Sequence, residues 1–80
     1  MDRYAETKQI INDMASVKMA MNSHKGNIEG VVPSRIIKLM EGEVDELKEA
    51  IDSKNLMHIL EEIADVQNFL IALAHRSITD

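Results

Sequence analysis

Two pairs of carboxylates, each spaced three residues apart, are the residues of this sequence best suited to chemistry. Glu43 and Glu46 form the first pair, and Glu62 and Asp65 form the second. Side chains three residues apart project from one side of a helix, so each pair can close on a shared cation. Oxygen ligands that converge from two helices suit a hard cation such as Mg²⁺, which proteins hold against phosphate chains. The spacing therefore predicts a hard-metal site.

Such a site requires both pairs to lie on neighbouring helices. Apolar residues recur with helical spacing, and no run alternates long enough to predict a strand. We expect an all-α fold with helices over about residues 3–22, 35–51 and 56–77, the second one capped by Ser34. The short DSKN turn between the last two helices predicts an antiparallel hairpin that carries both acidic pairs.

Helical wheels predict which side of each helix is buried. The first helix has an apolar seam and a flanking stripe: Ile10, Met14, Val17 and Met21 in the seam, and Tyr4, Ile11 and Ala15 in the stripe. The apolar arc of the second helix contains Ile36, Ile37, Met40, Val44, Leu47 and Ile51, and it also contains Glu43, with Glu46 at its edge. The broad apolar face of the third helix contains Ile59, Leu60, Ile63, Ala64, Leu70, Ile71 and Ala74. Glu62 and Asp65 are predicted to lie beyond that face, in a strip that Phe69, Ala72 and Leu73 surround and that is therefore not simply exposed. Gln67, in the middle of the main face, is predicted to find a polar partner.

Composition limits the class of protein. With 80 residues, the chain has room for one domain, residues 1–80, and for a thin core that often needs a partner chain. The absence of cysteine excludes disulfides and thiolate chemistry, and fits a soluble, cytoplasmic protein with no membrane segment. A net charge of −5, with no Trp and one Tyr and one Phe, argues against nucleic-acid binding.

The density of acidic charge favours a bound cation. From Glu41 to Asp65 there are nine acidic residues and two lysines. A single acidic pair at helical spacing is usually a solvated surface feature. Two pairs in one hairpin, with Glu43 inside an apolar arc where an unpaired carboxylate is costly, favour the metal interpretation.

The second half of the chain resembles a known superfamily. The segments LMEGEVDELKEAI and HILEEIADVQNFLIALAHRS resemble the MazG-like, all-α nucleotide pyrophosphohydrolases, whose signature is Glu-x-x-Glu, a spacer and Glu-x-x-Asp. The resemblance implies hydrolysis of a nucleoside triphosphate to the monophosphate and pyrophosphate with Mg²⁺, for which Mn²⁺ can substitute. It also implies a role in nucleotide metabolism and a three-helix protomer that assembles into an oligomeric helical bundle, as a homodimer or homotetramer.

The signature maps residue by residue onto this chain. The resemblance implies that the metal is held by Glu43, Glu46, Glu62 and Asp65. Glu46, at the edge of the arc, could instead activate water as the general base, and the sequence does not separate these two roles. Candidate phosphate-binding residues flank the hairpin: Lys54, which we prefer, Arg35, Lys38 and Lys25. Phe69 could contact the base or sugar, and His58 could support Glu62. The ordinary alternatives are a solvated surface charge for each lysine and arginine, core packing for Phe69 and a surface position for His58.

Three other functions are alternatives to nucleoside triphosphate hydrolysis. A non-catalytic helical oligomerisation or interaction module would explain the wide apolar faces without a metal. A phosphoribosyl-ATP pyrophosphohydrolase would share the acidic helices and differ in substrate. A di-iron bundle is disfavoured, because it would place glutamate three residues before a histidine, and that glutamate is missing at His24, His58 and His75.

Overall fold

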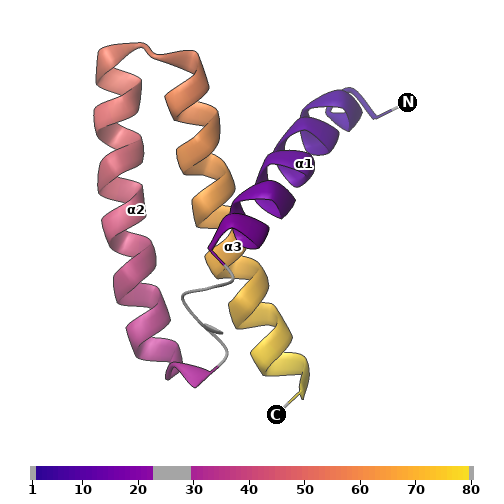
Figure 1. The fold of residues 1–80 in the computed structure, drawn as a ribbon, viewed down its shortest axis with the longest axis vertical. Helices are drawn as coiled ribbons and strands as arrows, with labels where there is room; N and C mark the ends of the chain where they lie inside the picture. The colour runs from indigo at the N-terminus through magenta and orange to yellow at the C-terminus, as the bar shows by residue number, and fades with distance from the viewer. Residues whose placement is uncertain (1, 23–29, 80) are drawn as a thin grey trace.

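The structure, a computed structural model, describes residues 2–22 and 30–79 and contains three helices in these ranges. α1 spans Ala5–Met21, α2 spans Pro33–Ser53 and α3 spans Leu56–Thr79. No strand occurs in the described ranges, which confirms the predicted all-α class there. α2 and α3 form an antiparallel hairpin, and α1 crosses α3 obliquely, so α3 contacts both other helices (Figure 1). Among the described residues, no helix has the length and apolar character needed to span a membrane.

The ends of α2 differ from the prediction. Pro33 occupies the first turn, where its missing N–H costs nothing, and Val32 is the N-cap with an extended backbone (φ −62°, ψ 146°). The prediction of Ser34 as the N-cap is wrong, because the residue before a proline is restricted to extended conformations and the helix begins at the proline itself. A short turn to α3 is confirmed, but α2 runs to Ser53, two residues beyond its predicted end at Ile51. Asn55 caps α3 by accepting a hydrogen bond from the His58 amide at 3.1 Å.

Lys54→Gly is expected to stabilise the protein. Lys54 ends α2 in the left-handed region (φ 58°, ψ 30°), and its N–H donates to the Ile51 carbonyl at 3.1 Å. A side chain is unfavourable in this conformation, which glycine adopts freely. We expect the free energy of unfolding to rise by about 0.5–1 kcal/mol, as measured by urea denaturation. The matched variant Lys48→Gly, inside α2, should lower it by about 1 kcal/mol. A Lys54→Gly protein less stable than the native one would contradict the prediction.

The core of the protomer is small. Six apolar side chains are buried among the described residues, and four of these are alanines: Ile11, Ala15, Ile36, Ala50, Ala64 and Ala72. The alanines allow the helices to approach closely, and Ile36 of α2 is the largest side chain that is fully buried among the described residues. A core of this size leaves much of the apolar surface of the helices in contact with solvent.

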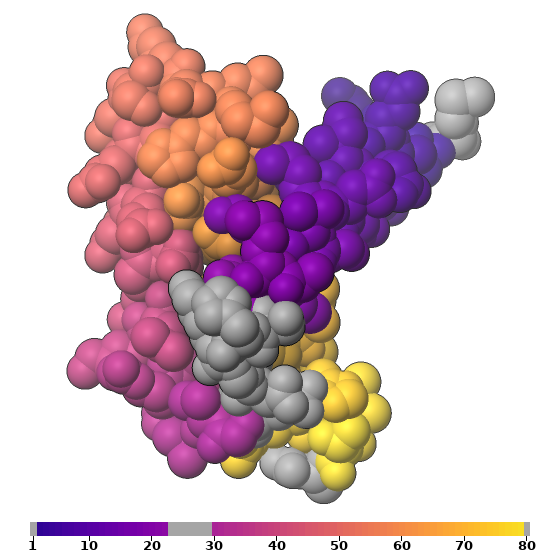
Figure 2. Space-filling model, in the orientation of Figure 1, coloured from indigo at the N-terminus to yellow at the C-terminus, as the bar shows by residue number. Residues whose placement is uncertain are grey.

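The predicted seam of α1 is largely exposed. Ile10 is 49% exposed, Val17 58% and Met21 65%, whereas Ile11 and Ala15 of the flanking stripe are buried. The prediction that the seam packs in the core is therefore wrong within this protomer. α1 contacts α3 through the stripe, and the space-filling view shows α1 projecting from the body of the hairpin (Figure 2).

The buried face of α3 is also rotated from its predicted position. Leu70 and Ile71 are 51% and 45% exposed, whereas Glu62 and Ala72 are buried. Glu62 thus lies within the buried surface and not beyond it, whereas the expectation that the strip with Ala72 is not simply exposed is confirmed. α1 and α2 both pack on α3, and their positions decide which of its side chains lose contact with water.

Amide side chains hold α1 against α3. The Gln67 amide donates to Asn12 Oδ1 at 2.7 Å, which confirms the predicted polar partner for Gln67. The Asn68 amide donates to the Ala15 carbonyl at 2.9 Å. These directional contacts set the position of α1 along α3 and therefore decide which α1 side chains reach the acidic hairpin.

Candidate metal centre

Three of the four predicted carboxylates converge between α2 and α3. Glu43 of α2 and Glu62 and Asp65 of α3 each offer an oxygen, and these oxygens all lie within 4.8 Å of one another. Glu62 is buried, and Glu43 and Asp65 are half-buried. The antiparallel hairpin brings residues about twenty positions apart in sequence to the same level, as the spacing predicted. We call Glu43, Glu62 and Asp65 the acidic triad.

Glu62 has an oxygen without a partner. Its side chain is 7% exposed, and its Oε1 lies 3.2 Å from His58 Nε2. Its Oε2 is buried and has no hydrogen-bond partner among the described residues. A buried carboxylate oxygen in this state is costly unless a proton or a cation satisfies it. The unpartnered oxygen thus indicates, independently of the clustering, that the triad has room for one more positive group.

The pKa of Glu43 also reflects the lack of positive charge at the triad. Burial is the largest cause that raises this pKa, from its ordinary value of 4.5 to about 8. The hydrogen bond with Glu62 is the second cause, and the negative charges of Glu46, Asp65 and Glu62 follow. At neutral pH and without a cation, Glu43 therefore keeps a proton, which it can share with Glu62. A divalent cation would replace that proton, because a positive charge favours the ionised carboxylate.

Lys18 of α1 also reaches the triad, and the sequence analysis did not identify it. Its Nζ lies 3.4 Å from Asp65 Oδ2, and the two side chains are 27% and 19% exposed. A signal for it was present in the sequence, because Lys18 lies three and seven residues after Ala15 and Ile11 and so shares their face of α1. The sequence could therefore have identified Lys18 as a lysine on the buried face of a helix that precedes an acidic hairpin.

The fourth predicted carboxylate, Glu46, lies outside the triad. Its side chain is exposed, and it affects the site through its negative charge, which helps to raise the pKa of Glu43. Exposure leaves Glu46 accessible to water, as a general base requires. Its role as a base or a ligand stays a prediction.

The predicted phosphate-binding residues on the hairpin are exposed, and each is separated from the triad along the axis of α2. With a rise of about 1.5 Å per residue, Lys38, Arg35 and Lys54 lie roughly 8, 12 and 16 Å from Glu43 along the helix axis. Phe69 is half-buried on α3. Lys25 and His24 lie outside the described residues. The substrate contacts assigned to these side chains stay predictions.

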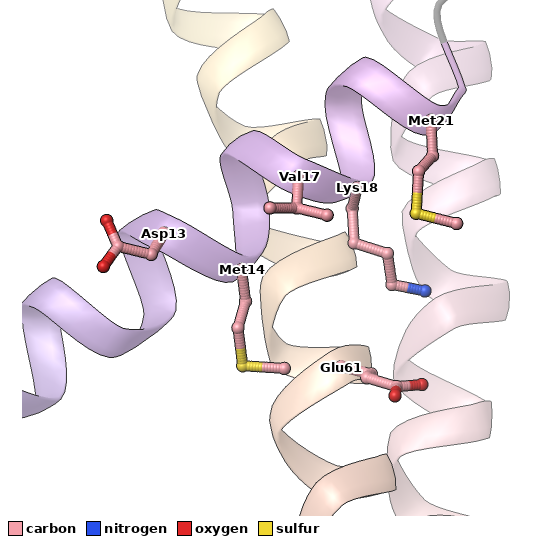
Figure 3. A pocket seen from close by; sticks show the side chains of 6 residues that line it. All are labelled: Asp13, Met14, Val17, Lys18, Met21 and Glu61. Atoms are coloured by element: carbon pink, nitrogen blue, oxygen red, sulfur yellow. The ribbon is translucent and has the colours of Figure 1, made fainter.

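An open groove lies between α1 and α3 beside Lys18, and none of the triad residues lines it. It has a volume of about 360 Å³ and is lined by Asp13, Met14, Val17, Lys18, Met21 and Glu61 (Figure 3). Its walls are mainly apolar, and Lys18 and Met14 project from α1 toward Glu61 of α3. Its volume is at the lower end of the range of about 300–1,000 Å³ that is typical of small-molecule sites.

No family model, curated protein or solved structure matches this chain. The superfamily resemblance is therefore carried by the residues alone. What the structure adds is that three of the four signature carboxylates come together between two helices.

Proposed function

We propose that this protein is a Mg²⁺-dependent nucleoside triphosphate pyrophosphohydrolase that produces a nucleoside monophosphate and pyrophosphate. The observation that carries the proposal is the acidic triad, with its buried, unpartnered Glu62 oxygen. The Glu-x-x-Glu and Glu-x-x-Asp signature, on the two helices of one hairpin, supports the assignment of the reaction.

The residues of the triad fit the proposed cation. All three offer hard carboxylate oxygens, which suit Mg²⁺. Glu62 Oε2, which has no hydrogen-bond partner among the described residues when the carboxylates are ionised, would be one of the oxygen ligands. Mg²⁺, or Mn²⁺ in its place, would be held by Glu43, Glu62 and Asp65.

Each side chain then has a distinct role. Bound Mg²⁺ would supply charge neutralisation for the phosphate oxygens and orientation for the attacking water. Asp65 and Glu62, fixed on adjacent turns of α3, set the position of the substrate phosphates relative to the hairpin. Glu46, the exposed carboxylate next to the triad, would accept the proton of the water that attacks the linkage between the α and β phosphates.

The experiment that tests the proposal is an assay of pyrophosphate release from a panel of canonical and modified nucleoside triphosphates, with phosphoribosyl-ATP beside them. The expected result is release that requires Mg²⁺ and stops when EDTA removes it. Release from phosphoribosyl-ATP alone would assign the protein to that related reaction. A folded protein that releases no pyrophosphate from any member of the panel would refute the proposal and leave the interaction module.

We also propose that a second copy of the chain covers the exposed seam of α1 around Ile10, away from the groove that Lys18 lines. The apolar residues of this seam share one side of the helix and remain largely exposed: Ile10, Val17 and Met21. A chain of 80 residues with six buried apolar side chains among those described has little core, and burial of this seam would enlarge it. The same exposed surface is what favours the interaction module as the second candidate function.

Ile10→Glu is expected to dissociate the oligomer. A carboxylate placed in the seam would have to be buried without a partner, which is costly. Sedimentation equilibrium should show that the native chain is a dimer or tetramer and that the variant is a monomer. Ala5→Glu adds the same charge on the opposite side of α1 and should leave the oligomer intact. A monomeric native protein would contradict the prediction.

A further inference from the structure

Lys18 is the cation that α1 contributes to the acidic triad in the described part of the chain. Its ammonium is within 3.4 Å of Asp65, and three quarters of its side chain is covered. The pair joins α1 to α3 beside two carboxylates, Glu43 and Glu62, that are themselves short of positive charge. Lys18 therefore lies where a bound cation and its anionic ligand would also lie.

Lys18 lies at the edge of an open groove as well as beside the triad. It lines the groove of about 360 Å³ between α1 and α3, where Met14 and Val17 form the apolar part of the wall (Figure 3). Asp13 and Glu61 add two carboxylates to the same lining, and among the described residues Lys18 is its one basic side chain. Lys18 is therefore the residue of this groove that could bind an anion.

Occupation of the triad would change what Lys18 can bind. A divalent cation held by Asp65 and its neighbours would offset the charge that now attracts the ammonium, and would repel it as a like charge. The four-carbon stem of lysine is flexible, so the ammonium can move into the groove without a shift of α1. Phosphate oxygens next to the cation would then be available partners for the ammonium, in competition with the carboxylates of Asp13 and Glu61 in the groove lining.

We propose that Lys18 binds the phosphate chain of the nucleotide substrate and leaves Asp65 when the triad takes up its cation. This inference rests on the proposed function, because it requires a metal at the triad and a phosphate ligand. Lys18 is thus a substrate-binding residue from α1, in addition to the residues that the hairpin supplies.

The test separates metal binding from phosphate binding. Calorimetric titrations would measure Mg²⁺ alone, and then inorganic pyrophosphate in the presence of Mg²⁺, on the native protein and on Lys18→Met. The variant should bind Mg²⁺ at least as tightly as the native protein, because a competing positive charge is gone. It should bind pyrophosphate about tenfold more weakly, which is the scale of one charge-assisted hydrogen bond. Lys18→Arg should recover most of that loss, and Lys8→Met, on α1 but paired with Asp2, should bind both as the native protein does.

A second measurement uses only the native protein, so its result does not depend on whether Lys18→Met folds. Acetylation of lysines, followed by mass spectrometry, should slow at Lys18 when Mg²⁺ and pyrophosphate are both present, while Lys8 serves as the internal reference. Unchanged labelling of Lys18, or native-like pyrophosphate affinity in folded Lys18→Met, would overturn the inference and leave an interhelical ion pair. If the native protein releases pyrophosphate from nucleoside triphosphates with Mg²⁺ in the separate activity assay, the proposed function survives that result. A native protein that binds no Mg²⁺ would refute both.

Discussion

Glu62→Gln is expected to abolish Mg²⁺ binding and to lower Mg²⁺-dependent pyrophosphate release by at least about 100-fold. Replacing a residue that only hydrogen-bonds to a metal ligand costs about 10–100-fold in metal affinity or activity, and the loss of a direct ligand should cost more. Glu62 is the most buried member of the acidic triad, and its Oε2 has no other partner among the described residues. The amide of glutamine has nearly the same shape but one oxygen and no charge. The change therefore removes a ligand without opening a cavity.

The measurements for Glu62→Gln are calorimetric titration with Mg²⁺ and the pyrophosphate assay, each preceded by circular dichroism to show that the variant is folded. Asp65→Asn should behave in the same way. Glu49→Gln, on the exposed side of α2, removes the same charge away from the triad and should retain native activity and metal affinity. Native rates in folded Glu62→Gln would exclude the triad as the site of the reaction.

Glu43→Gln is expected to stabilise the metal-free protein at neutral and alkaline pH while it eliminates activity. The folded pKa of Glu43, about 8, lies above the ordinary value of 4.5 expected in the unfolded chain. Between these two values the folded protein binds more protons than the unfolded protein does. The contribution of Glu43 to stability is therefore fully present below about pH 4.5 and is lost as the pH rises through about 8. Glutamine carries no charge at any pH, so the variant should not show this loss.

The size of the effect is limited by solvent. Glu43 is half-buried, and screening reduces the energetic consequence of its pKa shift to about 1 kcal/mol at pH 8, or about 4–8 °C in melting temperature for a domain of this size. Thermal melts in EDTA at pH 5, 6.5, 8 and 9 would measure it as the difference between the native protein and the variant. Glu49→Gln is again the matched control, and its difference from native should not grow with pH. Parallel pH profiles for native and Glu43→Gln would contradict the prediction.

The two variants together distinguish a functional site from a structural one. A carboxylate kept only for stability should lower stability when it is replaced. A carboxylate kept for metal binding, at a cost to the metal-free fold, should raise stability and abolish activity when it is replaced by its amide. Addition of Mg²⁺ should raise the melting temperature of the native protein and leave that of Glu43→Gln unchanged, because only the native triad binds the cation.

Much of this arrangement could be predicted from the sequence. The period of the apolar residues determined three helices, and the short turn at Lys54 and Asn55 determined that α2 and α3 are antiparallel. Those two facts suffice to bring Glu43 level with Glu62 and Asp65, because each position depends on local geometry that is regular along a helix. The half-burial of Glu43 also followed from its place inside the apolar arc.

Other features depended on how the helices pack. The wheel of α3 contains more apolar residues than one protomer buries, so only the positions of α1 and α2 decided that Glu62 is buried and that Leu70 is exposed. The seam of α1 stayed in solvent for the same reason. Lys18 reaches Asp65 because Gln67 and Asn68 hold α1 at one position along α3. The sequence by itself determined which residues can form an acidic site, since helical periodicity is local. The tertiary structure decided which of these residues are buried and that Lys18 is the basic side chain beside them, since burial depends on contacts between segments far apart in the chain.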